Sequence, residues 1–339
     1  MTAQTYLQQQ LETCARYKLS DADTDMIQSS GIEAFIYAKL TTKKFRKWAM
    51  NESSELQAER AIALNVAANK PIQFRYPFGG YKLWRMPGAP EVDWAEFLAI
   101  AYIATYLAPV AAAYAPGVEL VFASDDMIVE RMNNIAEADT SAYLDSFKAL
   151  LAVIRKQLPE NFTVDIVRVG DLYQNKPEME AEFATLIEKV TYDYEHVLDP
   201  EKKKRKMVMS ELNINWQGAE DFTKFTAEEK RQFVKRGAIY HDAYCMLSKR
   251  QQFNRGDEKI VIFTMIVPNA IAIGTTKRSV TKFWTGLGVL EQSGSDFRAK
   301  VIAPSGLETL IATTEAVAMP GLTSKNFRQI QVQTTPVKS

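Results

Sequence analysis

The sequence has few of the residues that build disulfide frameworks and metal sites. Its two cysteines, Cys14 and Cys245, lie far apart and form no CxxC pattern. This spacing argues against a disulfide-rich fold and against a zinc site, so we expect no metal. It is typical of proteins in a reducing compartment, so we expect a cytoplasmic protein. The two histidines, His196 and His241, are too few for a histidine-rich metal site. No GxSxG motif is present, and we interpret both histidines as structural or exposed.

The sequence also lacks an excess of charge of either sign. The 41 Lys and Arg residues balance 41 Asp and Glu residues, which gives no broad electrostatic reason to bind nucleic acid or an anionic membrane. We interpret a run of five basic residues, 202–206, as a solvated linker or helix end. The N-terminus has no basic-then-apolar signal-peptide pattern. We therefore expect neither nucleic-acid nor membrane partners.

One long uncharged stretch raises the question of a membrane span. Residues 97–115 carry no charge over 19 positions, a length close to that of a transmembrane helix. Most of them are Ala, Tyr and Thr, which drive membrane insertion weakly. The larger apolar residues share one helical face: Ile100, Ile103, Leu107 and Val110. A single apolar stripe predicts a helix buried in a protein core.

Strands alternate with helices in the middle of the chain. The apolar patterns predict strands at 118–123 and 162–171, and helices at 141–158, 176–198 and 227–247. Such alternation is typical of a parallel sheet, so we predict an α/β fold: a Rossmann-like, mostly parallel sheet with flanking helices. Later short apolar runs predict a mixed C-terminal extension of this sheet.

Composition divides the chain into three parts. We predict an N-terminal helical region at 1–68, a Rossmann-like domain at 69–310 and a C-terminal tail at 311–339. The stretch 69–94 holds four prolines and three glycines, so we interpret it as an extended, irregular segment. Five aromatic residues before Trp94 indicate that it packs, and we expect it to lie over a pocket.

The strand at 118–123 runs directly into Ser124, Asp125 and Asp126. In open α/β sheets, ligands collect beyond the carboxyl ends of the strands. One interpretation is therefore a polar anchor for a substrate amine or sugar hydroxyls, with Asp125 or Asp126 as a general base. The alternative is that these side chains only cap the following turn. Spacing alone leaves both open.

A second candidate group lies in the aromatic segment. Lys82 and Arg85 follow Gly79-Gly80, where the backbone can approach a ligand closely. We predict that Lys82 pairs with a phosphate or carboxylate and that the neighbouring Tyr81 binds substrate. The segment matches neither GxGxxG nor GxxxxGK[ST], so an ordinary surface turn stays the alternative.

Two further cationic groups come from the C-terminal half. Arg236 and Tyr240 are four residues apart on a predicted helix and so share a face. Lys277 and Arg278 lie in a turn rich in hydroxyl side chains, where they can hold a phosphate. A solvated hairpin turn is the alternative for this pair.

The order of these features resembles the isocyanide (isonitrile) synthase family, the pyoverdine/dityrosine biosynthesis proteins. The resemblance covers roughly residues 70–290. It begins with the lysine-containing aromatic segment and continues through these stretches: "PGAPEVDWAEFLAI", a long Ala-rich helix, "YAPGVELVFASDD", "YLDSFKALL" and "KRGAIYHDAY". Within them, Lys82 matches the second lysine of the family loop, Ser124 and Asp125 match the start of its "SDG" motif, and Arg236 matches its arginine.

The resemblance implies a Rossmann-like enzyme that condenses the α-amine of an amino acid with ribulose 5-phosphate, the source of the isonitrile carbon. It implies neither a metal nor a redox cofactor. It also implies a place in secondary-metabolite biosynthesis, with an iron/2-oxoglutarate oxygenase as a downstream partner.

The sequence departs from the family pattern at several positions. Tyr76 replaces the first lysine of the loop and Asp126 replaces the glycine of "SDG". Phe263 and Leu287 stand about where the two family histidines belong. Since imine formation needs an acid/base group that titrates near neutral pH, we expect a divergent member of the family. A non-catalytic small-molecule or partner-binding protein on the same scaffold is the alternative.

Overall fold

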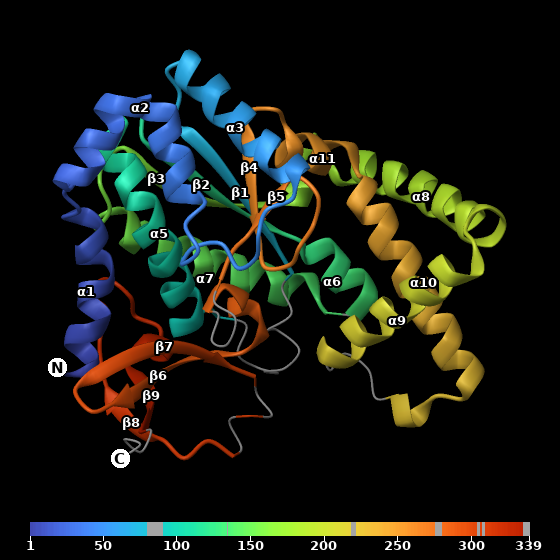
Figure 1. Cartoon of the computed structure of the whole chain (residues 1–339). Helices are drawn as coiled ribbons and strands as arrows, with labels where there is room; N and C mark the ends of the chain where they lie inside the picture. The colour runs from blue at the N-terminus through green and yellow to red at the C-terminus, as the bar shows by residue number, and fades with distance from the viewer. Residues whose placement is uncertain are drawn as a thin grey trace.

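A five-stranded parallel sheet forms the centre of the computed structural model (Figure 1). The structure describes residues 1–79, 91–133, 135–217, 222–274, 280–303, 306 and 309–334. The strand order is β3-β2-β1-β4-β5. The strands are β1 (Ile72–Phe78), β2 (Val118–Ser124), β3 (Phe162–Arg168), β4 (Lys259–Phe263) and β5 (Ala270–Ala272). The predicted α/β class with a Rossmann-like parallel sheet is confirmed.

Helices cover both faces of this sheet. On β1, Tyr76 and Phe78 pack into an aromatic cluster with Phe147 of α7 (Glu137–Arg155). The next residue back, Arg75, faces the opposite side, where it lies over the Phe253 ring of α11 (Ser248–Arg255). Because successive strand residues point to opposite faces, α7 and α11 lie on different sides of the sheet. Helices α5 (Trp94–Ala113) and α3 (Glu52–Ala67) also pack against it.

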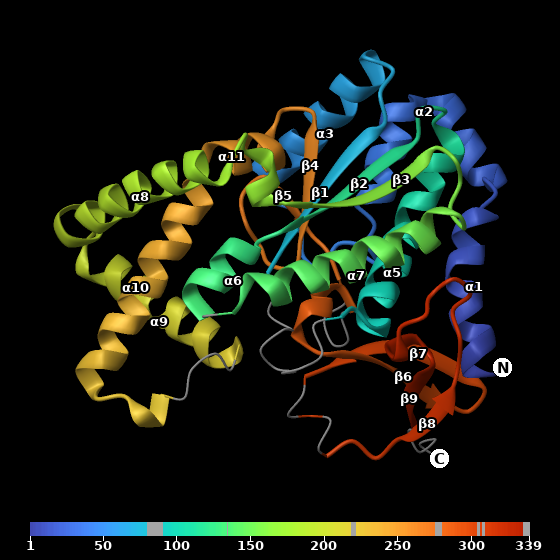
Figure 2. The same cartoon turned by 180° about the vertical axis from the view of Figure 1, so that it is seen from behind.

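The remaining helices form two groups beside the sheet (Figures 1 and 2). Helices α1 (Ala3–Ala15) and α2 (Asp21–Leu40) pack against α5. On the other side, three helices form an arm with its own hydrophobic core: α8 (Lys176–Tyr192), α9 (Pro200–Gln217) and α10 (Ala227–Met246). The short helix α6 (Asp126–Asn133) joins the carboxyl end of β2 to this core. The basic run 202–206 lies on α9.

A second, mixed sheet follows the first in the chain. Its order is β7-β6-β9-β8, with β6 (Leu287–Ser293), β7 (Asp296–Ile302), β8 (Thr313–Ala316) and β9 (Gln329–Thr334). The later strands therefore divide: β4 and β5 complete the parallel sheet, while β6 to β9 form a separate one instead of extending it. Residues 313–334, within the predicted tail, supply two strands of this second sheet.

Strand β1 corrects one prediction. Residues 72–78 belong to the segment expected to be irregular, yet they form the middle strand of the parallel sheet. The proline signal was misleading because β1 pairs with β4 only from Gln73 to Arg75. Pro77 lies beyond the part of the strand that is bonded on both sides, where a missing N–H is tolerated.

Helix α5 contains most of the uncharged stretch, and the prediction of a buried helix is confirmed. It begins with a capping box, in which Asp93 accepts from the first turn and Glu96 accepts from the Asp93 N–H. Among the described residues, α5 is the one helix long and apolar enough to cross a membrane, and 78% of its most apolar window is buried inside the protein.

Candidate functional site

The carboxyl ends of β1, β2 and β3 meet at one edge of the parallel sheet. The register pairs Ser124 of β2 with Phe78 on one side and Arg168 on the other. The Asp125 N–H continues this pairing by donating to the Phe78 carbonyl at 2.8 Å. Asp126 then begins helix α6. The strand therefore delivers one hydroxyl and two carboxylates to the edge where open α/β sheets bind ligands.

Asp126 is a buried carboxyl group beside an arginine. It is 3% exposed, and its Oδ2 lies 2.6 Å from Nε of Arg168, which also contacts Glu130 at 3.0 Å. Burial raises the pKa of Asp126 to about 6, while Ser124 and Arg168 act in the opposite direction. Asp126 can therefore take up or release a proton near neutral pH.

A cavity of about 640 Å³ opens beside Asp126. Its wall comes from α6, the turn after β3 (η1, Val169–Leu172) and the start of α8. The cationic residues in the wall are Arg131, Arg168 and Lys176, and the acidic residues are Asp126, Glu130, Glu137, Asp171 and Glu180. Ion pairs join all three cations to acidic residues: Arg131 to Glu180, Arg168 to Asp126 and Glu130, and Lys176 to Glu137. The wall is thus left with a small excess of negative charge, which suits a ligand that carries an amine.

Asp125 faces a different neighbourhood from Asp126. Its Oδ1 accepts a hydrogen bond of 2.7 Å from the Tyr244 hydroxyl, and the Arg250 guanidinium lies 3.3 Å from both carboxylate oxygens. Arg250 also lies over the Tyr244 ring at 4.8 Å. Asp125 thus joins the end of β2 to α10 and α11. In the present arrangement its carboxylate is occupied by protein groups.

The predicted cationic partner from α10 lies elsewhere. Arg236 is exposed, packs over the Phe233 ring at 4.8 Å and lines a surface groove that includes Lys224 but none of residues 124–126. Tyr240 packs edge-on against Phe183 of α8, with 5.8 Å between ring centroids. The structure therefore does not bring Arg236 to the carboxylates. The substrate-binding roles of Arg236 and Tyr240 remain predictions.

The other predicted site residues are Tyr81, Lys82, Lys277 and Arg278, and all four lie outside the described residues. Tyr76, which replaces the first family lysine, is fully buried in β1, and its hydroxyl donates to the Thr281 carbonyl. This contact ties the segment at 280–285 to the sheet. Tyr76 thus has a packing role here.

Sequence reasoning missed the three groups that contact the carboxylates. Arg168 had a readable signal, because it ends the strand that pairs with β2 and so reaches the same sheet edge. Tyr244 had a weaker one, since it follows Tyr240 by one helical turn. Arg250 had none, because it lies in a mostly polar helix whose position depends on tertiary packing. Among the described residues, no group of three or more His, Cys, Asp or Glu residues could hold a metal ion.

The fold and this edge define a class: a Rossmann-like α/β protein with a charged cavity at the carboxyl ends of its strands. Comparisons of the sequence with protein-family models and with curated proteins give no match. The structure is similar to the crystal structure of the PvcA protein from Pseudomonas aeruginosa, with a TM-score of 0.64 and 15% sequence identity. The similarity covers 90% of this chain and 100% of PvcA. At this identity it shows a shared fold.

Proposed function

We propose that the chain is a divergent isonitrile-synthase-like enzyme of small-molecule biosynthesis that acts on the amine of an amino acid, with ribulose 5-phosphate as co-substrate. Two independent findings support this proposal. The sequence resembles the isonitrile synthases in the order of its features over roughly residues 70–290. The fold is shared with PvcA over nearly the whole of both chains.

The buried carboxyl group of Asp126 is the observation that carries the proposal. Condensation of an amine with a carbonyl group requires a base that takes a proton from the ammonium group and an acid that returns one to the departing hydroxyl. The family histidines are replaced here by Phe263 and Leu287. Asp126, with its pKa of about 6, lines the charged cavity and can exchange a proton near neutral pH.

The neighbouring groups of the cavity support this role. Arg168 fixes the Asp126 carboxylate through their ion pair and is itself held by Glu130. The excess of acidic residues in the wall matches the amine of the substrate. The phosphate and the carboxylate of the substrates need cations, and we assign these to Lys82, Lys277 and Arg278. Ser124, 3% exposed at the end of β2, is proposed as a further polar contact.

Mass spectrometry tests the activity directly. The purified chain is incubated with each common amino acid and with ribulose 5-phosphate labelled with ¹³C, and the label is sought on the amine nitrogen of the product. We expect Asp126→Asn to lower turnover by about 10²–10⁴-fold, the range for loss of a general acid or base. Asp145→Asn, on the exposed side of α7, is the matched control and should keep full activity.

Two outcomes would contradict the proposal at different levels. Full turnover by a folded Asp126→Asn variant would remove Asp126 from the chemistry. Thermal stabilisation by an amino acid or a pentose phosphate, with no product from any combination, would favour the non-catalytic binding protein instead.

A further inference from the structure

A second group of reactive side chains lies on α10, outside the cavity beside Asp126. Cys245 and His241 are one helical turn apart, and Sγ lies 3.9 Å from Nε2 and 4.0 Å from Nδ1 of the imidazole. His241 Nδ1 lies 3.6 Å from Oδ1 of Asp242, whose other oxygen is bound by Lys206 of α9. The thiol, the imidazole and the carboxylate thus follow one another at contact distances of 3.6–4.0 Å, close enough for a charge on the imidazole to act on the sulfur.

The charged groups around Cys245 and His241 favour the ionised form of both side chains. Burial opposes ionisation of the Cys245 thiol, but His241 and then Arg250 outweigh it and lower the thiol pKa, while Asp125 acts against them. Burial likewise opposes a charge on His241, but Asp242 and Cys245 raise the pKa of the imidazole. A cysteine beside a protonated histidine has a larger fraction of thiolate, the reactive form of the side chain.

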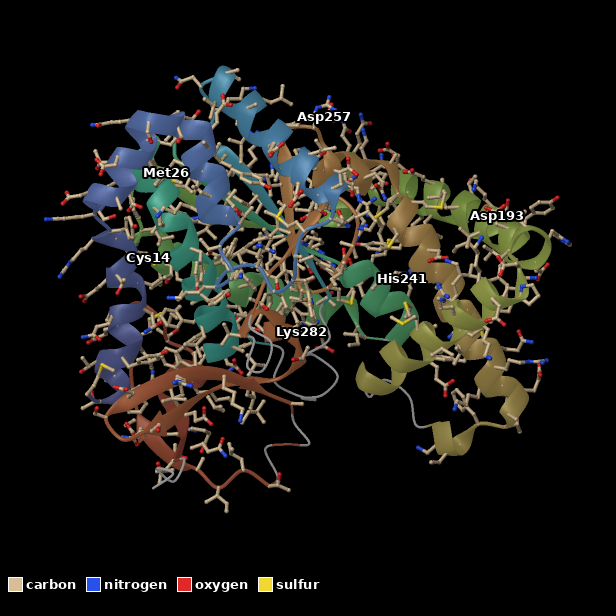
Figure 3. All side chains as sticks on the ribbon, viewed as in Figure 1. Cys14, Met26, Asp193, His241, Asp257 and Lys282 are labelled. Carbon is tan, nitrogen blue, oxygen red and sulfur yellow. The ribbon has the colours of Figure 1, made fainter. Side chains whose placement is uncertain are left out.

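The second cysteine provides a contrast within the same chain. Cys14 is 1% exposed on α1, its thiol contacts Thr105, and burial raises its pKa. Cys245 is partly exposed, and the His241 side chain beside it is 48% exposed. Figure 3 labels Cys14 on α1 and His241 on α10, on opposite sides of the molecule. The two cysteines therefore cannot form a disulfide with each other.

We propose that Cys245, activated by His241, is a nucleophilic thiolate site that reacts with hydroperoxides. In this step the sulfur attacks one peroxide oxygen, an S–O bond forms and the O–O bond breaks. Sulfur is oxidised by two electrons to the sulfenic acid, and the peroxide is reduced. The departing hydroxide, or the alkoxide of an organic hydroperoxide, takes a proton from the His241 imidazolium and leaves as water or as the alcohol. Asp242, held by Lys206, is a positioning residue for the imidazole.

Thiol alkylation tests the activation without any assay of turnover. The folded protein is treated with iodoacetamide between about pH 5 and pH 9, and labelling of Cys245 and Cys14 is followed by peptide mass spectrometry. We expect Cys245 to react already below pH 7 and Cys14 to react only after unfolding. His241→Gln should move the midpoint of the Cys245 rate profile upward, with about a tenfold loss of rate at low pH for each pKa unit. His196→Gln, at the exposed second histidine, is the matched control.

Hydrogen peroxide followed by a 1,3-diketone trap tests the oxidation itself. The trap should add to Cys245 in the wild type, should add far less in His241→Gln, and should give no adduct at this position in Cys245→Ser. Two results would overturn the proposal: equal alkylation of both cysteines in the folded protein, or an unchanged rate profile in a folded His241→Gln variant. Neither result bears on Asp126, so this inference and the proposed condensation activity fail independently.

Discussion

Replacing Asp126 by asparagine should change how the stability of the protein depends on pH. The pKa of this carboxyl group rises from 3.8 to about 6 on folding because the side chain is buried. A shift of about two pKa units corresponds to about 3 kcal/mol. Since the folded-state pKa is the higher one, Asp126 disfavours the folded state increasingly as the pH rises from about 4 to about 6, and the cost is complete above this range. Asparagine does not titrate and removes this dependence.

The measurement is urea unfolding of both proteins at about pH 5 and about pH 8. The free energy of unfolding of the wild type, relative to Asp126→Asn, should fall by about 1.5 kcal/mol between these pH values. Asp145→Asn controls for the loss of a carboxylate at the surface. An identical difference at both pH values, or a wild type that gains on the variant as the pH rises, would refute the assignment of a raised pKa.

Three further substitutions test the framework of the site. Tyr244→Phe removes the hydrogen bond to Asp125 and should cost about 1–2 kcal/mol in urea unfolding; an unchanged midpoint would show that the bond contributes nothing. Gly117→Ala should cost about 2–4 kcal/mol, because φ is +77° and a Cβ would lie 1.8 Å from the Asn161 carbonyl oxygen; a fully stable variant would contradict this backbone geometry. Asp93→Ala removes the N-cap of α5 and should lower the melting temperature through a loss of about 1 kcal/mol; an unaltered melting curve would argue against the cap.

The sequence contained enough information to predict the class of fold but not its division into two sheets. The buried helix α5 and the strands β2 and β3 follow from local apolar patterns, which burial on one or both faces imposes directly. Strand β1 was missed because Pro77 and the following glycines suggest a loop, and only the pairing with β4 shows why a proline is tolerated there. The separation of β6 to β9 from the first sheet depends on long-range pairing, which short apolar runs do not encode.

The candidate site was predictable only in part for a similar reason. Residues 124–126 follow from the rule that ligands collect at carboxyl ends of parallel strands, and the structure brings Arg168 to the same edge. The choice of Arg236 as their counterpart rested on a helical face whose orientation the sequence does not determine. The packing of α10 instead turns Tyr244 toward the sheet and leaves Arg236 exposed.

Helix α5 has a consequence for the integrity of the whole chain. Its apolar surface is covered by α1 and α2 from one end of the sequence, and at its start the Trp94 indole packs on Phe327 and donates to the Gln329 carbonyl from the other end. Neither terminal segment can therefore be removed without uncovering part of helix α5. Shortening the chain at either end would expose apolar surface of this twenty-residue helix, which would then bind another chain or a lipid surface in place of the missing partner.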